Sequence, residues 1–124
     1  MNQGFSNPRE LQSHFIDVAQ EPWVHTKFDG IEMKILYSDS GGRSAILFRM
    51  KPGAIVPFHE HSDVEMTYML DGALEDNEGS VTTGNFVWRP GGHRHVARSP
   101  SGATFLSIFN RPNIFHDGIP FFTE

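Results

Sequence analysis

The sequence contains no cysteine among its 124 residues, which excludes a disulfide framework and a thiolate site. It has no basic run and its formal net charge is −5, so nucleic acid is not an expected partner. No apolar stretch approaches the roughly 18 residues that span a bilayer. Residues 1–5 lack the charged-then-apolar layout of a signal peptide. We therefore expect a cytoplasmic protein without a membrane partner.

The chain does contain many phenylalanines and evenly spread turn residues: 11 Phe, 12 Gly and 8 Pro. Short apolar runs between the turns predict strands at 24–27, 31–37, 43–50, 55–61, 64–70, 74–75, 80–83, 86–89, 93–98 and 103–109. About ten short strands with closely spaced turns indicate an all-β sandwich or barrel. We expect one domain over residues 1–124, with a lead-in segment at 1–22, where Asn7 caps a short helical turn, and an irregular tail at 111–124. The Asp71–Gly72 pair is typical of a hairpin turn.

Three histidines and one glutamate form the strongest chemical pattern. His59 and His61 are two residues apart in a predicted strand, so both rings point to one face. Glu65 has the same parity at the start of the next strand, and His95 follows a Pro-Gly-Gly turn. Imidazoles and a carboxylate suit one divalent metal ion, Fe²⁺ or Zn²⁺, with Mn²⁺ or Ni²⁺ as alternatives. A single strand histidine is more often a surface or hydrogen-bonded residue, so the pattern must be judged by its surroundings.

Glycine and proline frame these four residues at fixed spacings. Residues 53–72 read G-x5-H-x-H-x3-E-x6-G, and residues 84–95 read G-x5-P-x-G-x2-H. Both strings match the two motifs of the cupin superfamily, so the chain resembles a cupin. The resemblance implies a double-stranded β-helix, a jelly-roll-like β-barrel, with the metal ion on His59, His61, Glu65 and His95. One departure is Ser99, where the family often has Asn.

Within the superfamily, residues 54–108 resemble the ChrR-like group, notably in the stretches Leu-Glu-Asp-Asn-Glu-Gly at 74–79 and Arg-Ser-Pro-Ser-Gly at 98–102. That group binds zinc or iron, and some members are domains of zinc-binding anti-sigma factors. More distantly similar dioxygenases cleave carbon–carbon bonds in diketones or hydroxyacetophenones, using iron on three histidines without the glutamate. This chain differs from those dioxygenases in having Glu65. It also lacks the Cys of the anti-sigma factors' separate N-terminal zinc domain.

Function and partners are open between two hypotheses. The first is an oxygenase-type enzyme acting on a small organic carbonyl or carboxylate compound, with Glu65 as a catalytic group as well as a ligand. The alternative is a non-catalytic sensor that binds a metal or ligand, similar to the ChrR cupin domain. A homodimer is expected in either case. The predicted substrate pocket, for which core packing or a surface ion pair is the alternative reading, comprises Phe48, Met50, Thr67, Met69, Trp88, Arg89 and Phe105.

Overall fold

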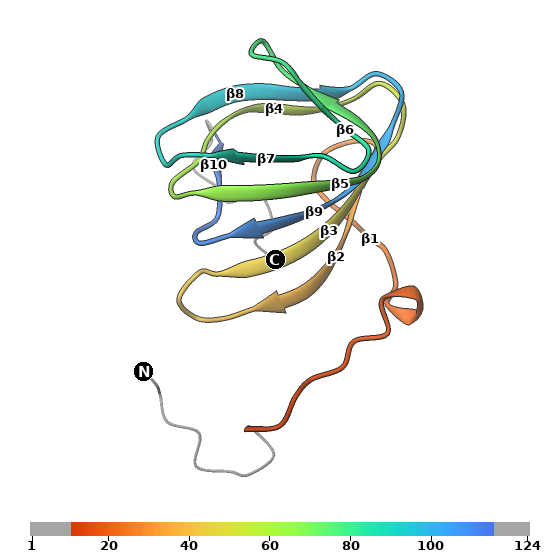
Figure 1. Cartoon of the computed structure of the whole chain (residues 1–124), viewed down its shortest axis with the longest axis vertical. Coiled ribbons are helices and arrows are strands. Elements are labelled where there is room, and N and C mark those ends of the chain that lie inside the picture. The colour runs from red at the N-terminus through yellow and green to blue at the C-terminus, as the bar shows by residue number, and fades with distance from the viewer. Residues whose placement is uncertain (1–10, 116–124) are drawn as a thin grey trace.

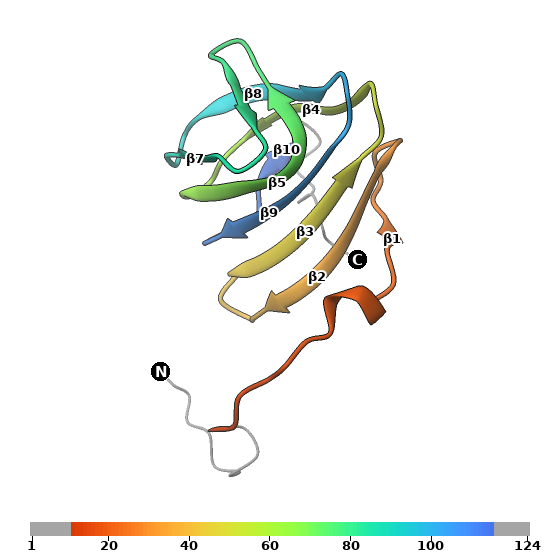
Figure 2. The same cartoon turned by 45° about the vertical axis from the view of Figure 1, so that its right-hand side comes forward.

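The computed structural model describes residues 11–115, and nearly all of its regular structure is β-strand (Figures 1 and 2). A three-residue 3₁₀ turn, η2 (Val18–Gln20), precedes the strands. The strands are β1 (Val24–His25), β2 (Ile31–Ser38), β3 (Ser44–Met50), β4 (Ala54–Glu60), β5 (Glu65–Glu75), β6 (Ser80–Thr82), β7 (Phe86–Arg89), β8 (Arg94–Ser99), β9 (Ala103–Phe109) and β10 (Ile114–Phe115). No helix among the described residues has the length and apolar character needed to span a membrane.

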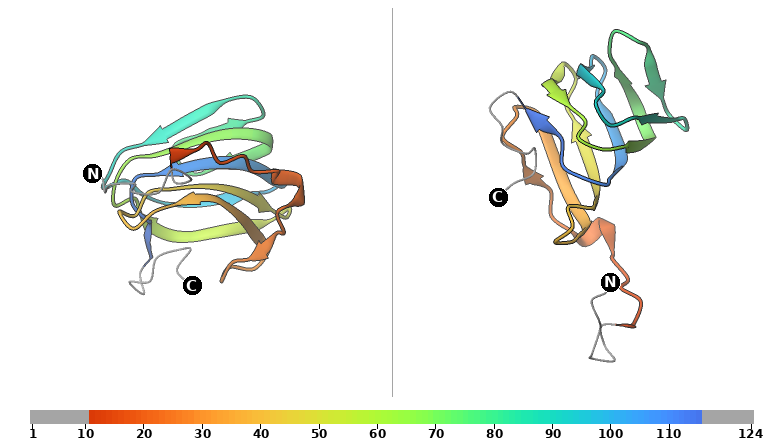
Figure 3. Two further views of the ribbon diagram at one scale, coloured as in Figure 1. Left: turned by 90° about the horizontal axis from the view of Figure 1, so that it is seen from below. Right: turned by 90° about the vertical axis from the view of Figure 1, so that its left-hand side faces the viewer.

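The strands form one curled antiparallel sheet in the order β1-β2-β3-β9-β5-β8-β4-β10, with β6 and β7 also paired to β5. The curl brings both ends of the order around a common interior (Figures 1 and 3). β5 makes the curl possible because it is shared: its first half pairs with β7 and β9, and its second half pairs with β6 and β8. The all-β barrel predicted from the sequence is therefore confirmed.

Alternating burial along the strands produces the core. β8 and β9 alternate strictly between buried and more exposed residues, as expected where successive side chains point to opposite faces of a sheet. The rings of Phe48 and Phe105 pack at 5.4 Å between centroids, and Phe109 meets Phe48 edge-on. The most deeply buried core residues are Ile31, Ile46, Phe48, Met50, Met69 and Phe109.

The hairpin predicted at Asp71–Gly72 is wrong. β5 runs without interruption through this pair, and its register against β9 shifts between Met69 and Asp71. Gly72 has a φ of 87°, and a Cβ there would collide with the carbonyl oxygen of Gly102. Glycine is required here for a bulge and a close strand approach, not for a turn.

Two further expectations concern the ends of the chain. The tail is not irregular throughout, because Ile114 and Phe115 pair with β4 as strand β10. The helical turn predicted at Asn7 lies outside the described residues. The N-terminal segment leads away from the barrel (Figure 1), and Phe15 in it is 93% exposed. The homodimer stays a prediction.

Candidate metal centre

Three histidine rings meet inside the barrel because of strand register. His59 on β4 is directly opposite His95 on β8, so both side chains point inward. His61 follows His59 by two residues and points the same way. All three are at most 5% exposed. The Nε2 atom of His95 lies 3.1 Å from Nε2 of His59 and 3.0 Å from Nε2 of His61.

The other ring nitrogens of His59 and His95 fix their tautomers. Nδ1 of His59 lies 2.7 Å from the carbonyl oxygen of Pro57, and Nδ1 of His95 lies 2.7 Å from Oδ2 of Asp76. Both partners accept hydrogen bonds, so each Nδ1 carries the proton and each Nε2 carries a lone pair. Two lone pairs then face each other at 3.1 Å with no proton between them, an arrangement that a cation stabilises.

Asp76 holds His95 through a dense set of contacts in the turn after β5. Its Oδ2 also forms an ion pair with Nη1 of Arg89 at 3.0 Å, and its Oδ1 accepts hydrogen bonds from the backbone amides of Glu78 at 2.8 Å and Gly79 at 3.2 Å. A carboxylate that accepts the second N–H of a ligand histidine orients the ring and raises its basicity.

Glu65 lies beside His61 at the start of β5. Its Oε1 is 2.8 Å from Nδ1 of His61, yet this nitrogen has no aligned hydrogen-bond partner among the described residues. The two atoms are close but not aligned for a hydrogen bond, so the contact places the Glu65 carboxylate beside the imidazole cluster. The prediction that Glu65 is itself a ligand stays a prediction.

Burial sets the charge state of the cluster. Desolvation lowers the pKa of His59 to about 4, only partly opposed by its hydrogen bond to Pro57. It also lowers the pKa of His95, although Asp76 opposes the shift. Burial alone would raise the pKa of the Glu65 and Asp76 carboxyls, but the neighbouring histidines and Arg89 outweigh it and the net shift is downward. Neutral imidazoles beside ionised carboxylates are the forms that bind metal ions.

The three histidines therefore fit a metal ion, and they group as possible ligands in the structure. A second group of possible ligands, Asp76, His93 and His95, overlaps the first. Arg89 places a positive charge 3.0 Å from Asp76, and His93 is engaged with Glu78 at 2.9 Å. These contacts make the second group a support for His95 and a poor cation site.

The structure separates the predicted pocket residues into four groups. Phe48 and Phe105 line a cavity of about 30 Å³ that also touches His59 and Glu65. Met50, Thr67 and Met69 are buried but lie off its wall, and Thr67 shares a hydrogen bond with Ser107. Trp88 lies 61% exposed, so its expected place in the pocket is corrected to the outer face. Arg89 points inward to Asp76.

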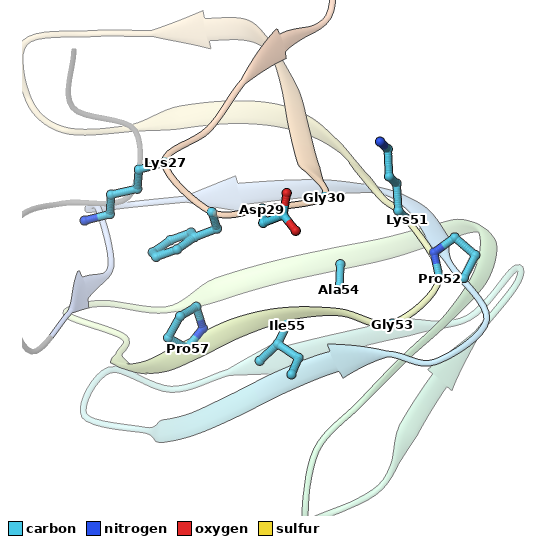
Figure 4. Close-up of a pocket in the computed structure, with 10 residues that line it drawn as sticks. Lys27, Asp29, Gly30, Lys51, Pro52, Gly53, Ala54, Ile55 and Pro57 are labelled. Carbon is cyan, nitrogen blue, oxygen red and sulfur yellow. The ribbon is translucent and has the colours of Figure 1, made fainter.

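A larger groove lies away from these residues (Figure 4). It has a volume of about 440 Å³ between the β1–β2 connection and β4, with Lys27, Phe28, Lys51, Ile55 and Pro57 among its lining residues. None of the four predicted ligands lines it. Despite its size, the groove does not border the histidine cluster.

Sequence reasoning missed Asp76 and Asn113. Asp76 lies in the Leu-Glu-Asp-Asn-Glu-Gly stretch that carries the family resemblance. An Asp side chain often accepts a hydrogen bond from the backbone amide two residues later, so an Asp in such a stretch is a signal for a turn. Asn113 is 4% exposed and lines the small cavity. No periodicity marks it, because it stands between β9 and β10.

Comparison of the sequence with protein-family models supports the interpretation of the chain as a cupin. The model of the ChrR Cupin-like domain matches residues 11–113. No curated protein matches the chain in sequence.

Solved structures agree on the fold. An acetylacetone dioxygenase from Acinetobacter johnsonii has a TM-score of 0.77 at 17% identity, covering 95% of this chain and 89% of that one. A candidate acetylacetone dioxygenase from Methylibium petroleiphilum PM1 has a TM-score of 0.80 at 18% identity, with 97% and 90% covered. The complex of SigE with the anti-sigma ChrR from Rhodobacter sphaeroides has a TM-score of 0.65 at 24% identity, covering 73% of this chain and 50% of that one. At these identities the likeness establishes the cupin fold alone.

Proposed function

This chain belongs to the ChrR Cupin-like domain family, and from that premise we propose that it is a metal-dependent enzyme of the oxygenase type. Its substrate would be a small organic carbonyl or carboxylate compound. The observation that carries the proposal is an inward-facing set of histidine lone pairs with empty space on one side. His59 and Glu65 both border the cavity of about 30 Å³. A purely structural metal site is closed by protein on all sides, whereas a catalytic site keeps a position open.

Three imidazoles beside a carboxylate would suit Fe²⁺, Mn²⁺, Ni²⁺ or Zn²⁺. We favour iron because imidazole and carboxylate ligands with open positions are the ligand set of oxygen-activating iron sites.

The protein's own residues would divide the work. His59, His61 and His95 would hold the ion, with Pro57 and Asp76 fixing two of the rings. Glu65, ionised beside His61, would act as a fourth ligand or as a base that removes a proton from the substrate. Phe48, Phe105 and Phe109 would exclude bulk water. The ion would polarise a carbonyl or carboxylate oxygen and, as iron, react with dioxygen.

A non-catalytic sensor is the second candidate, and cavity size is the observation that favours it. A cavity of about 30 Å³ holds a ligand of one or two non-hydrogen atoms, whereas binding pockets for larger organic ligands are on the order of 300 Å³ or more. An organic substrate therefore requires side chains of the cavity wall to move. A sensor of metal, or of a very small ligand, requires no such movement.

The deciding experiment is elemental analysis of protein purified without added metal, followed by oxygen uptake with diketones and hydroxyketones. Stoichiometric iron with substrate-dependent oxygen consumption, both lost in His95→Ala, supports the enzyme. Tightly held zinc without oxygen uptake supports the sensor. Protein that holds no metal, either as purified or after incubation with Fe²⁺ or Zn²⁺, contradicts both the enzyme and a metal sensor.

A further inference from the structure

Asn113 stands out as a buried polar side chain on the wall of the small cavity. Apart from His59 and Glu65, the other lining side chains are apolar, among them Phe48, Phe105 and Phe109. Asn113 is 4% exposed, and its Oδ1 has no hydrogen-bond partner among the described residues. A buried amide oxygen without a hydrogen-bond partner destabilises the fold, so a polar occupant of the cavity would offset this cost.

The position of Asn113 is fixed by the same stretch of chain that carries the histidines. β10 begins at the next residue, and its Phe115 pairs with His59 on β4. On the other side of Asn113, the carbonyl oxygen of Pro112 accepts a hydrogen bond of 2.6 Å from Oγ of Ser62, which follows His61. Pro112 and Phe115, on either side of Asn113, are thus bound to residues 59–62, so Asn113 is held next to this segment.

The cavity also limits what the amide can meet. One water needs about 10–15 Å³ of such space, so about 30 Å³ accepts one or two non-hydrogen atoms. A carboxamide has both an acceptor and donors. The amide can therefore accept a hydrogen bond from a water molecule, or donate one to a ligand oxygen that carries no proton.

We propose that Asn113 positions a small oxygen-bearing ligand, of one or two non-hydrogen atoms, in the cavity beside His59 and Glu65. Asn113 acts by hydrogen bonding to the ligand and does not bind the metal ion. This inference deepens the proposed function and rests on the histidine cluster as a metal site, but the contact between the amide and the cavity ligand exists without metal.

The first test is a crystal structure of the metal-free protein, for wild type and Asn113→Leu, which is similar in size but apolar. We expect a water oxygen within hydrogen-bond distance of the Asn113 amide in the wild type and none in the variant. A dry cavity in the wild type overturns the proposal whatever the metal chemistry.

The second test loads both proteins with Fe²⁺ under anaerobic conditions and titrates nitric oxide, a two-atom probe, while the electron paramagnetic resonance signal is followed. Metal content should be equal in the two proteins, and the Kd for nitric oxide should rise about tenfold in Asn113→Leu, as expected for loss of one buried hydrogen bond. Asn113→Ala gives a second reading if the leucine variant folds poorly. Asn85→Ala, which removes an exposed amide that bonds Thr82, is the matched control.

The outcomes separate the two ideas. Equal nitric oxide affinity in wild type and both Asn113 variants overturns the role of Asn113 while the metal site stands. Wild-type protein that holds no iron but shows the ordered water refutes the proposed enzyme and keeps the role of Asn113 as the polar anchor of the cavity.

Discussion

The interior of the barrel has two unlike halves. On β2, β3 and β9 the inward side chains are mostly apolar and closely packed, with Ile31, Ile46 and Phe48 at most 2% exposed, although Ser44 and Ser107 are buried there too. On the inner side of β4 and β8 lie three imidazoles, and the carboxylate of Glu65, at the start of β5, lies beside one of them. Burying apolar area stabilises the fold by itself. Burying facing lone pairs does not, and a bound cation would stabilise this half.

The largest effect expected from this contrast is the loss of metal from His95→Ala. The variant removes one of three converging nitrogens and leaves Asp76 without its imidazole donor. Loss of metal affinity should exceed about 100-fold, more than is typical for removing a supporting residue. Elemental analysis after desalting measures the change, and circular dichroism checks the fold. A folded variant with its metal intact would contradict the site.

The apolar half is tested by Phe48→Ala. Truncating a buried phenylalanine costs about 3–5 kcal/mol in the free energy of unfolding, measured by urea titration of the metal-free protein. The folded fraction should still bind one metal ion, since Phe48 offers no ligand atom and packs against the rings of Phe105 and Phe109. A variant that keeps its stability but loses its metal would show that the two halves are not separate.

A smaller effect on metal binding than that of His95→Ala is expected from Asp76→Asn. An asparagine weakens the acceptor for Nδ1 of His95 and breaks the ion pair with Arg89, so metal affinity should fall about 10- to 100-fold. Competition with a chromophoric chelator gives the value. Glu75→Gln is the control, because this neighbouring carboxylate forms an ion pair with the exposed Arg98 on the surface. Equal losses in the two variants would point to general charge effects instead of the orientation of His95.

Acid should weaken the metal-free protein through the histidine half. The pKa of His59 is about 4 in the folded state against an ordinary value of 6.5, so between these pH values the unfolded chain binds the proton and the folded chain does not. Stability is therefore full above about pH 6.5 and falls as the pH drops towards 4. At about 1.4 kcal/mol per pKa unit, the loss from pH 7 to pH 5 is on the order of 2 kcal/mol. Urea titrations at both pH values measure it, and a pH-independent result contradicts the burial of a neutral His59.

The smallest effect should come from the outer face of the same strands. Glu60 lies between the two motif histidines but points outward to an exposed Arg94 at 3.0 Å. Such surface pairs contribute about 0–1 kcal/mol, so Glu60→Ala should change neither stability nor metal content appreciably. Metal loss in this variant would mean that the inward and outward assignments on β4 are reversed.

The sequence predicted the strands and the histidine cluster because both depend on local spacing. Alternation alone places His59 and His61 on one face, and the glycine frame locates His95. Alternation also explains an error: Trp88 and Arg89 are consecutive on one strand, so they could not both face the pocket. The structure shows Arg89 inside and Trp88 outside.

What could not be predicted depends on tertiary placement. Asp76 and Asn113 stand in turns, where no period relates a residue to a face, and each reaches the site only after distant strands have paired. The Asp71–Gly72 pair carries the local chemistry of a hairpin, yet the close approach of Gly102 makes it part of a continuous strand. Local propensity was overridden there by the curl of the sheet.

The pairing of His59 with His95 closes a loop of 36 positions, and this has a kinetic consequence. Pairing between strands far apart in sequence forms slowly, because the chain must lose the entropy of loop closure first. In the unfolded chain only His59 and His61 are near each other, so the unfolded chain offers an ion at most a partial site. A bound ion should therefore act mainly on the lifetime of the folded protein, because it slows unfolding of the closed barrel far more than it speeds folding.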